Sequence, residues 1–133
     1  MSKDAQIAEI TAGYQFDEPA INLGVLLADD EPVPSAQIQI PLSMLNRHGL
    51  VCGATGTGKT KTLQLLAEQI SGAGVPVFAA DIKGDLSGIA SPGEPSEKLL
   101  ERTKGIGQDW QPRPCPTEFF ALGGEGIGVP LRA

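Results

Sequence analysis

One segment of the sequence has the residue types that hold a chain of phosphates. Residues 53–60 read Gly-Ala-Thr-Gly-Thr-Gly-Lys-Thr, a full match to the pattern G-x-x-x-x-G-K-[ST]. Its three glycines let the backbone curl around an anion in conformations that a Cβ atom would hinder. The N–H groups of such a loop point inward, and a helix that begins at its end adds the positive end of its dipole. The segment therefore predicts a phosphate-binding loop, or P-loop.

The positions of this loop have separate expected roles. Lys59 is expected to reach the β- and γ-phosphates and is the candidate catalytic residue. The Thr60 hydroxyl is expected to ligate Mg²⁺. ATP and Mg²⁺ are the predicted cofactors. ATP is preferred to GTP because the sequence has no Asn-Lys-x-Asp segment with which GTPases read guanine. The predicted nucleotide contacts are Gly53, Ala54, Thr55, Gly56, Thr57, Gly58, Lys59, Thr60 and Lys61.

A carboxylate at the end of an apolar run is the second candidate for chemistry. Residues 75–80 read Val-Pro-Val-Phe-Ala-Ala, and Asp81 follows them. If the run is a parallel strand, Asp81 lies at its carboxyl end, where α/β sheets place their ligands. Asp81 could be the Mg²⁺-side acid of a Walker B motif. Alternatively it flanks the site while a later strand supplies that acid, which we favour because no Glu follows Asp81; a solvated turn is the third interpretation.

Four other residues have weaker claims to chemistry. His48, the single histidine, is expected to be a turn residue rather than a catalytic base. Trp110 lies in Asp-Trp-Gln-Pro and is expected to anchor packing between prolines, with nucleotide stacking as the alternative. Cys52 and Cys115 lack metal-ligand spacing, and no disulfide is expected between them. Cys52 ends an apolar run beside the loop and is expected to be a small buried thiol.

The elements around the loop predict how it is held. Residues 50–52 form a short apolar segment typical of a strand, residues 59–70 a helix, and residues 75–80 a second strand. The apolar residues of that helix recur at i, i+3, i+4 and i+7, on one face: Leu63, Leu66, Ala67 and Ile70. Strand, helix and strand in this order predict a right-handed βαβ unit with parallel strands, covered on both faces.

The remaining sequence predicts flanking elements. Residues 1–45 read as a small β-rich lead-in, a hairpin or short meander with strands at 21–27 and around 36–40 and a turn at 29–32. Further on, residues 96–103 predict a short helix and residues 117–122 a third strand. The expected domains are thus a lead-in over 1–45 and the first part of a P-loop NTPase domain over 46–133.

Composition limits the partners and the compartment. The net charge is −6, and Lys and Arg form no cluster. Because phosphate neutralisation supplies much of the affinity of nucleic-acid binders, any DNA contact is expected to come from elsewhere or from an oligomer. No segment has the length and hydropathy of a signal peptide core or a membrane span. A soluble cytoplasmic protein without membrane contact is expected.

A resemblance joins these features. From Asn46-Arg-His-Gly-Leu50 through the loop to Asp81-Ile-Lys-Gly-Asp-Leu86, the sequence resembles the amino-terminal part of the bacterial HerA-like ATPases, relatives of the FtsK-type DNA pumps. The likeness extends from about Ile21 into the Phe119-Phe-Ala-Leu-Gly segment, and residues 45–86 carry it.

The resemblance implies an α/β fold of the additional-strand, RecA-like P-loop NTPase class, with ATP hydrolysis, hexameric rings and work on double-stranded DNA. It places nucleotide contacts at Gly53, Gly58, Lys59 and Thr60. The later Walker B strand, the catalytic acid and the arginine finger of that family match nothing in this sequence. The sheet is therefore expected to be incomplete, and hydrolysis is expected of a longer parent protein.

Two other functions stay open at this point. One is a small phosphotransferase of the nucleotide-kinase kind with Asp81 as its metal-side acid, which would need an Arg-rich lid. Arg102 and Arg113 are the arginines in the relevant half, and neither lies in a convincing lid. The other is a module that binds nucleotide without turning it over.

Overall fold

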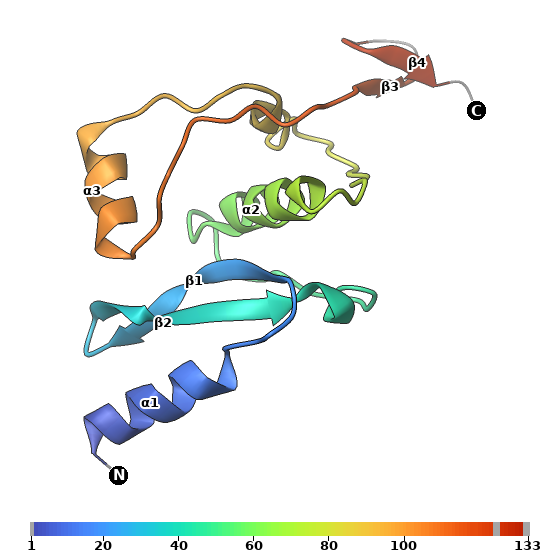
Figure 1. Cartoon of the computed structure of the whole chain (residues 1–133). Coiled ribbons are helices and arrows are strands. Elements are labelled where there is room, and N and C mark those ends of the chain that lie inside the picture. The colour runs from blue at the N-terminus through green and yellow to red at the C-terminus, as the bar shows by residue number, and fades with distance from the viewer. Residues whose placement is uncertain (1, 124–125, 132–133) are drawn as a thin grey trace.

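A β-hairpin holds the most buried apolar side chains among the described residues. In the computed structural model, which describes residues 2–123 and 126–131, strands β1 (Ala20–Ala28) and β2 (Glu31–Pro41) pair antiparallel, with Ile21 opposite Ile40 (Figure 1). The side chains of Ile21 and Ala36 are almost completely buried, at 2% and 0% exposure. The hairpin expected from the alternating pattern is confirmed, and it forms a small core.

Two aspartates make the tight turn between these strands. Asp29 and Asp30 have φ angles of 54° and 64°. Positive φ at both central residues is the type I′ arrangement, whose twist matches that of the flanking strands. Aspartate enters this left-handed region more readily than most residues, because its short polar side chain can bond locally. The predicted turn at 29–32 is therefore also confirmed.

An N-terminal helix, α1 (Lys3–Gly13), was not expected from the sequence. Its N-cap is Ser2, whose hydroxyl accepts a hydrogen bond from the Ala5 N–H at 3.3 Å, as short polar caps do. α1 packs against β2, and Lys3 forms an ion pair with Asp29 of the hairpin turn at 2.6 Å. The lead-in therefore contains a helix as well as the β-hairpin.

The helix that follows the glycine-rich loop is present as predicted. α2 (Lys59–Gly72) ends at the Ala73 C-cap, and Gly74 follows with a φ of 84°. The Val75 N–H returns to the Ile70 carbonyl at 3.2 Å, the bond that commonly closes a helix before such a glycine. Figure 1 shows α2 between the hairpin and the long segments that lead to and from α3.

The prediction of a strand on each side of the loop and its helix is wrong. Residues 50–52 and 75–80 form no strand, and Leu50 and Phe78 are 87% and 86% exposed. Parallel strands obtain their hydrogen bonds from neighbours across a crossover, and neither segment pairs with another in the described part of the chain. The parallel βαβ sheet expected around the loop is thus not formed, and the described residues form a small α/β arrangement with two separate two-stranded sheets.

The second half of the chain has little regular structure. A 3-10 turn, η2 (Ser87–Ala90), precedes α3 (Glu97–Gly105), which confirms the short helix predicted there. A strand was predicted at 117–122, and only its end is a strand in the structure, β3 (Phe120–Leu122). β3 pairs in parallel with β4 (Val129–Leu131), which was not expected. Another 3-10 turn, η1 (Leu42–Met44), follows β2.

The end of α3 contacts the hairpin. The Gln37 side chain of β2 donates a hydrogen bond to the Ile106 carbonyl at 3.3 Å. Thr103, in the last turn of α3, is buried and donates to the Leu99 carbonyl at 3.0 Å.

Across the described residues, the helices are too short or too polar to cross a membrane.

Candidate functional site

The glycine-rich loop (residues 53–60) leads directly into α2. Gly58 is the N-cap of α2, with φ 94° and ψ 12°, and no side chain caps the first turn. The N–H groups at the start of a helix have no partner within the helix itself. Because no cap side chain occupies them here, they are available to an anion, and the helix dipole favours a negative charge at this end.

The loop is closed around one carbonyl oxygen. The Ala54 carbonyl accepts hydrogen bonds from the Thr57 N–H at 3.3 Å and from the Thr57 hydroxyl at 2.7 Å. It also accepts one from the Lys59 ammonium at 2.6 Å. The Lys59 side chain thus folds back over the loop and holds its charge there. A bond between an ammonium and a neutral carbonyl is one that a phosphate oxygen can replace with a stronger one.

Glycine is required at the turns of this loop. Gly56 and Gly58 have φ angles of 82° and 94°, a region that side chains strain. A Cβ atom at Gly53 would lie 2.6 Å from the Thr57 hydroxyl oxygen, too close for any real contact. The glycine spacing noted in the sequence is therefore explained by backbone conformation and by a close approach inside the loop.

The predicted contact residues do not all face the same way. Residues 53–58 are exposed, and Lys59 and Thr60 are half-buried where α2 begins. Lys61 turns away from the loop, because its ammonium donates to the Gln64 side-chain oxygen at 2.9 Å. The structure therefore gathers Gly53, Ala54, Thr57 and Lys59 around the Ala54 carbonyl, and it directs Lys61 along α2.

Asp81 organises its own turn. One oxygen of its carboxylate accepts the N–H groups of Lys83 and Gly84 at 3.1 and 3.0 Å, and the other accepts that of Leu86 at 2.7 Å. These bonds stabilise the charged form and hold the pKa of Asp81 below its usual range, with the Leu86 N–H as the largest cause. Both carboxylate oxygens are thus occupied by the backbone of residues 83–86.

Gln64 connects α2 to the Asp81 turn through a hydrogen bond. Its side-chain nitrogen donates to the Asp85 carbonyl at 2.9 Å, while its oxygen accepts from Lys61. The glutamine has no signal in the sequence beyond its place on the polar face of the helix. Among the residues that the structure describes, no three or more His, Cys, Asp or Glu side chains are grouped to hold a metal ion.

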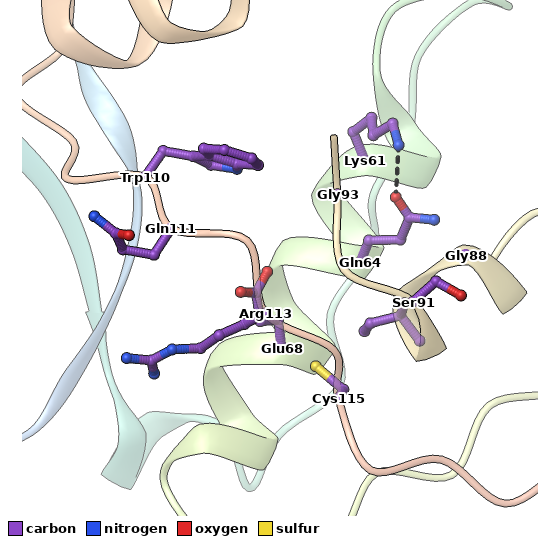
Figure 2. Close-up of a pocket in the computed structure, with 11 residues that line it drawn as sticks. Lys61, Gln64, Glu68, Gly88, Ser91, Gly93, Trp110, Gln111, Arg113 and Cys115 are labelled. Carbon is purple, nitrogen blue, oxygen red and sulfur yellow. Dashed lines mark hydrogen bonds between the residues drawn. The ribbon is translucent and has the colours of Figure 1, made fainter. Parts of the chain in front are cut away.

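A pocket of about 190 Å³ lies beside the polar face of α2 (Figure 2). Its wall is formed by α2, by residues 88–93 and by residues 110–115. The half-buried Trp110 is part of this wall, and a Cβ atom at Gly93 would lie 3.1 Å from the indole ring. A second hollow of about 270 Å³ shares four wall residues with it: Glu68, Trp110, Gln111 and Arg113.

The remaining candidates from the sequence lie apart from the loop contacts. His48 is exposed. Cys52 is exposed rather than buried, which corrects the expectation, because the apolar segment that it ends does not become a covered strand. Cys115 is half-buried in the pocket wall, and both thiols are free. Burial raises the pKa of the Cys115 thiol, and the nearby Glu68 carboxylate adds to the effect.

Comparison with known proteins bears on most of the chain. Residues 26–133 match the family model described as "Helicase HerA-like C-terminal". A search of curated proteins found no match, and neither did a search of solved structures. The matched segment includes the glycine-rich loop, α2, the Asp81 turn and the pocket. The chain therefore belongs to the family of helicase HerA-like C-terminal domains.

Proposed function

We propose that this chain binds ATP with Mg²⁺ through the glycine-rich loop, as part of a HerA-like ATPase that moves along or unwinds double-stranded DNA. The observation that carries the proposal is the position of Lys59, whose ammonium lies 2.6 Å from the Ala54 carbonyl at the uncapped start of α2. A loop that already holds a cation beside free helix N–H groups is suited to a phosphate chain.

Each residue then has a role in the nucleotide complex. Lys59 exchanges the Ala54 carbonyl for the β- and γ-phosphate oxygens and is the group that stabilises charge in hydrolysis. The N–H groups of residues 53–60 hold the phosphates, that of Thr57 once it leaves the Ala54 carbonyl, and the Thr60 hydroxyl ligates Mg²⁺. Lys61, in the first turn of α2, is a further proposed contact of the nucleotide, for which its ammonium has to leave the Gln64 side chain.

Asp81 acts as the organiser of the turn beside the site rather than as a metal ligand. Its two oxygens accept three backbone N–H groups, so most of the acceptor capacity of the carboxylate is used within the turn. A Walker B role for Asp81 is the competing proposal. The two proposals predict different effects of removing the Asp81 carboxylate. The loss of a metal ligand weakens the binding of Mg²⁺, whereas the loss of a turn contact leaves the binding of Mg²⁺ unchanged.

The larger assembly is part of the proposal. We place a lead-in at residues 1–45 and the start of an additional-strand, RecA-like P-loop NTPase domain at residues 46–133. The exposed apolar side chains of Leu50, Val77 and Phe78 suit strands that become covered once a parallel sheet is complete. With a net charge of −6, DNA contacts and hexamer formation depend on surfaces outside this chain or on its repetition in a cytoplasmic ring.

Calorimetry of MgATP binding tests the proposed site. Removing the charge-assisted bonds of Lys59 in Lys59→Ala is expected to cost about 1.5–3 kcal/mol, or roughly ten- to a hundredfold in affinity. Lys98→Ala is the matched control, because Lys98 lies in the first half of α3 and is exposed. Equal affinities of the unmodified chain and of Lys59→Ala for MgATP would show that the loop is not the nucleotide site.

Phosphate release separates the proposed ATPase from a module that only binds. The described residues near the loop include no carboxylate bonded to it that could activate water. We therefore expect binding without turnover by the 133-residue chain, and turnover in a longer natural form that adds a catalytic acid. Transfer of phosphate to a nucleoside or sugar acceptor would instead favour a nucleotide kinase.

A further inference from the structure

The pocket beside α2 begins where the glycine-rich loop ends. Lys61 belongs to its wall and directly follows Thr60, the last residue of the loop. Gln64 and Glu68 continue the wall along the same face of α2, at i+3 and i+7 from Lys61 (Figure 2). At 1.5 Å per residue, Lys61 and Glu68 are about 10 Å apart along the helix axis. The pocket wall therefore continues along α2 from the residue that follows the loop.

The pocket wall has the chemistry of a nucleoside site. Trp110 offers a flat aromatic surface, which attracts nucleobases of any sequence through stacking. Gln111 carries an amide, which can both donate to and accept from a base edge. The Glu68 carboxylate is an acceptor suited to the hydroxyl groups of a ribose. Lys61 adds positive charge at the end of the wall next to the loop, and Arg113 adds it elsewhere in the wall.

The size of the pocket favours a base over a whole nucleotide. Its volume of about 190 Å³ is below the roughly 300–1,000 Å³ of pockets that bury a complete drug-sized ligand. A triphosphate bound at the loop would stay outside it, so only the base and part of the sugar need to enter. Trp110 is half-buried and borders this space, so part of its ring is accessible to a base.

We propose that this pocket binds the nucleoside part of the nucleotide, with the base stacked on Trp110 and its phosphates on the glycine-rich loop. The inference rests on the proposed ATP site, and it adds the element that distinguishes a nucleotide from a bare phosphate chain. Gly93 gives the indole ring its place in the wall, because a Cβ atom there would lie 3.1 Å from the ring. Trp110 is the single tryptophan of the chain, so tryptophan fluorescence reports on this pocket and on the second hollow that Trp110 also borders.

Fluorescence titrations with three ligands test the assignment. MgATP is expected to change the Trp110 emission, and magnesium tripolyphosphate is expected to compete with ATP while leaving the emission nearly unchanged. Adenosine is expected to change the emission only at far higher concentration, because it lacks the phosphate contacts. In Lys59→Ala the ATP response is expected to shift to roughly ten- to a hundredfold higher concentration.

Variants of Trp110 give a second readout by calorimetry. Trp110→Ala is expected to weaken MgATP roughly five- to a hundredfold and to leave tripolyphosphate unchanged, since a lost base stack has that size. Trp110→Phe keeps an aromatic ring and is expected to restore most of the ATP affinity. Phe120→Ala is the control, because that exposed ring lies in β3 and does not line the pocket. Tripolyphosphate binding shows that each variant keeps the loop folded.

The outcomes separate this inference from the ATP proposal. If ATP and tripolyphosphate bind the parent chain equally well, or if Trp110→Ala weakens both by the same factor, the nucleoside assignment is overturned while the loop remains a phosphate site. If neither ligand binds, or if Lys59→Ala changes nothing, the phosphate site fails and the nucleoside assignment fails with it.

Discussion

Gln69 bonds to the backbone of Asn22 through both ends of its side-chain amide. The Asn22 N–H donates to the Gln69 oxygen at 2.7 Å, and the Gln69 nitrogen donates to the Asn22 carbonyl at 2.7 Å. A residue of a neighbouring strand would make the same pair of bonds with Asn22. The side chain of α2 thereby substitutes for a strand at the edge of β1, and it fixes the helix that follows the glycine-rich loop onto the hairpin.

We expect Gln69→Ala to destabilise the protein. Its loss leaves the Asn22 N–H and carbonyl without their partners at a half-buried position, so the free energy of unfolding should fall by about 1–3 kcal/mol. Denaturation in urea followed by circular dichroism measures it. Glu68→Ala, at the neighbouring exposed position, controls for helix propensity and should change stability by no more than about 0.5 kcal/mol. Equal losses in the two variants would show that the amide pair does not anchor α2.

Thr60→Ala should alter the dependence of ATP binding on magnesium. If the Thr60 hydroxyl is a ligand of Mg²⁺, its removal lowers the gain in ATP affinity that Mg²⁺ provides and leaves metal-free ATP binding nearly unchanged. Thr60→Ser retains the hydroxyl and should behave as the parent chain does. Calorimetric titrations with ATP in Mg²⁺ and in a chelator measure the difference. A Thr60→Ala variant with a full magnesium effect would contradict the assigned role.

The Asp81 turn should loosen in acid. Because its backbone contacts lower the pKa of Asp81, the carboxylate stabilises the turn above its ordinary pKa near 4, and this contribution is lost as the pH falls through the lower folded-state value. The backbone amide resonance of Leu86, which is bonded to the carboxylate, should therefore titrate below about pH 4. Asp81→Asn should abolish that titration. A Leu86 resonance that titrates equally in both proteins would place the effect elsewhere.

The two cysteines should differ in reactivity. The thiolate is the species that alkylating agents attack, and a raised pKa leaves less of it. Cys115 is half-buried with a raised pKa, while Cys52 is exposed, so Cys52 should be alkylated first at about pH 8. Mass spectrometry of the digested protein measures the two rates. Burial is the larger cause of the raised pKa and the Glu68 carboxylate adds to it, so Glu68→Gln should accelerate Cys115 modestly. Faster alkylation of Cys115 than of Cys52 in the unmodified chain would contradict the structure.

Local signals in the sequence predicted the elements that depend on local contacts. The glycine spacing of the loop, the apolar period of α2 and the Asp-Asp turn each draw on neighbours a few residues away, and each is found in the structure. α3 follows the same rule, since the Ser96 hydroxyl accepts the Leu99 N–H at 3.2 Å as an N-cap. α1 had a similar signal in Ser2 and Asp4, but its weak apolar period gave no reason to prefer a helix.

The strands beside the loop could not be predicted from the same kind of signal. Their apolar composition indicates burial, but a parallel strand exists only if partners distant in sequence supply its hydrogen bonds. In the structure Leu50, Val77 and Phe78 remain exposed. The pocket likewise depends on contacts across more than 40 residues, between α2 and Trp110, and no local pattern indicates it. In the sequence analysis, only the alternative that Trp110 stacks on a nucleotide indicated a binding role for this part of the chain.

The binding of MgATP at the glycine-rich loop is the central claim, and backbone amide resonances test it most directly. A titration with MgATP should shift the amides of Gly56, Gly58, Lys59 and Thr60 strongly, because their N–H groups would bond to phosphate oxygens. Amides of the hairpin, such as that of Val33, should stay unchanged. Saturable shifts confined to the loop and the pocket are the predicted result. Unchanged loop resonances at millimolar MgATP would contradict the account.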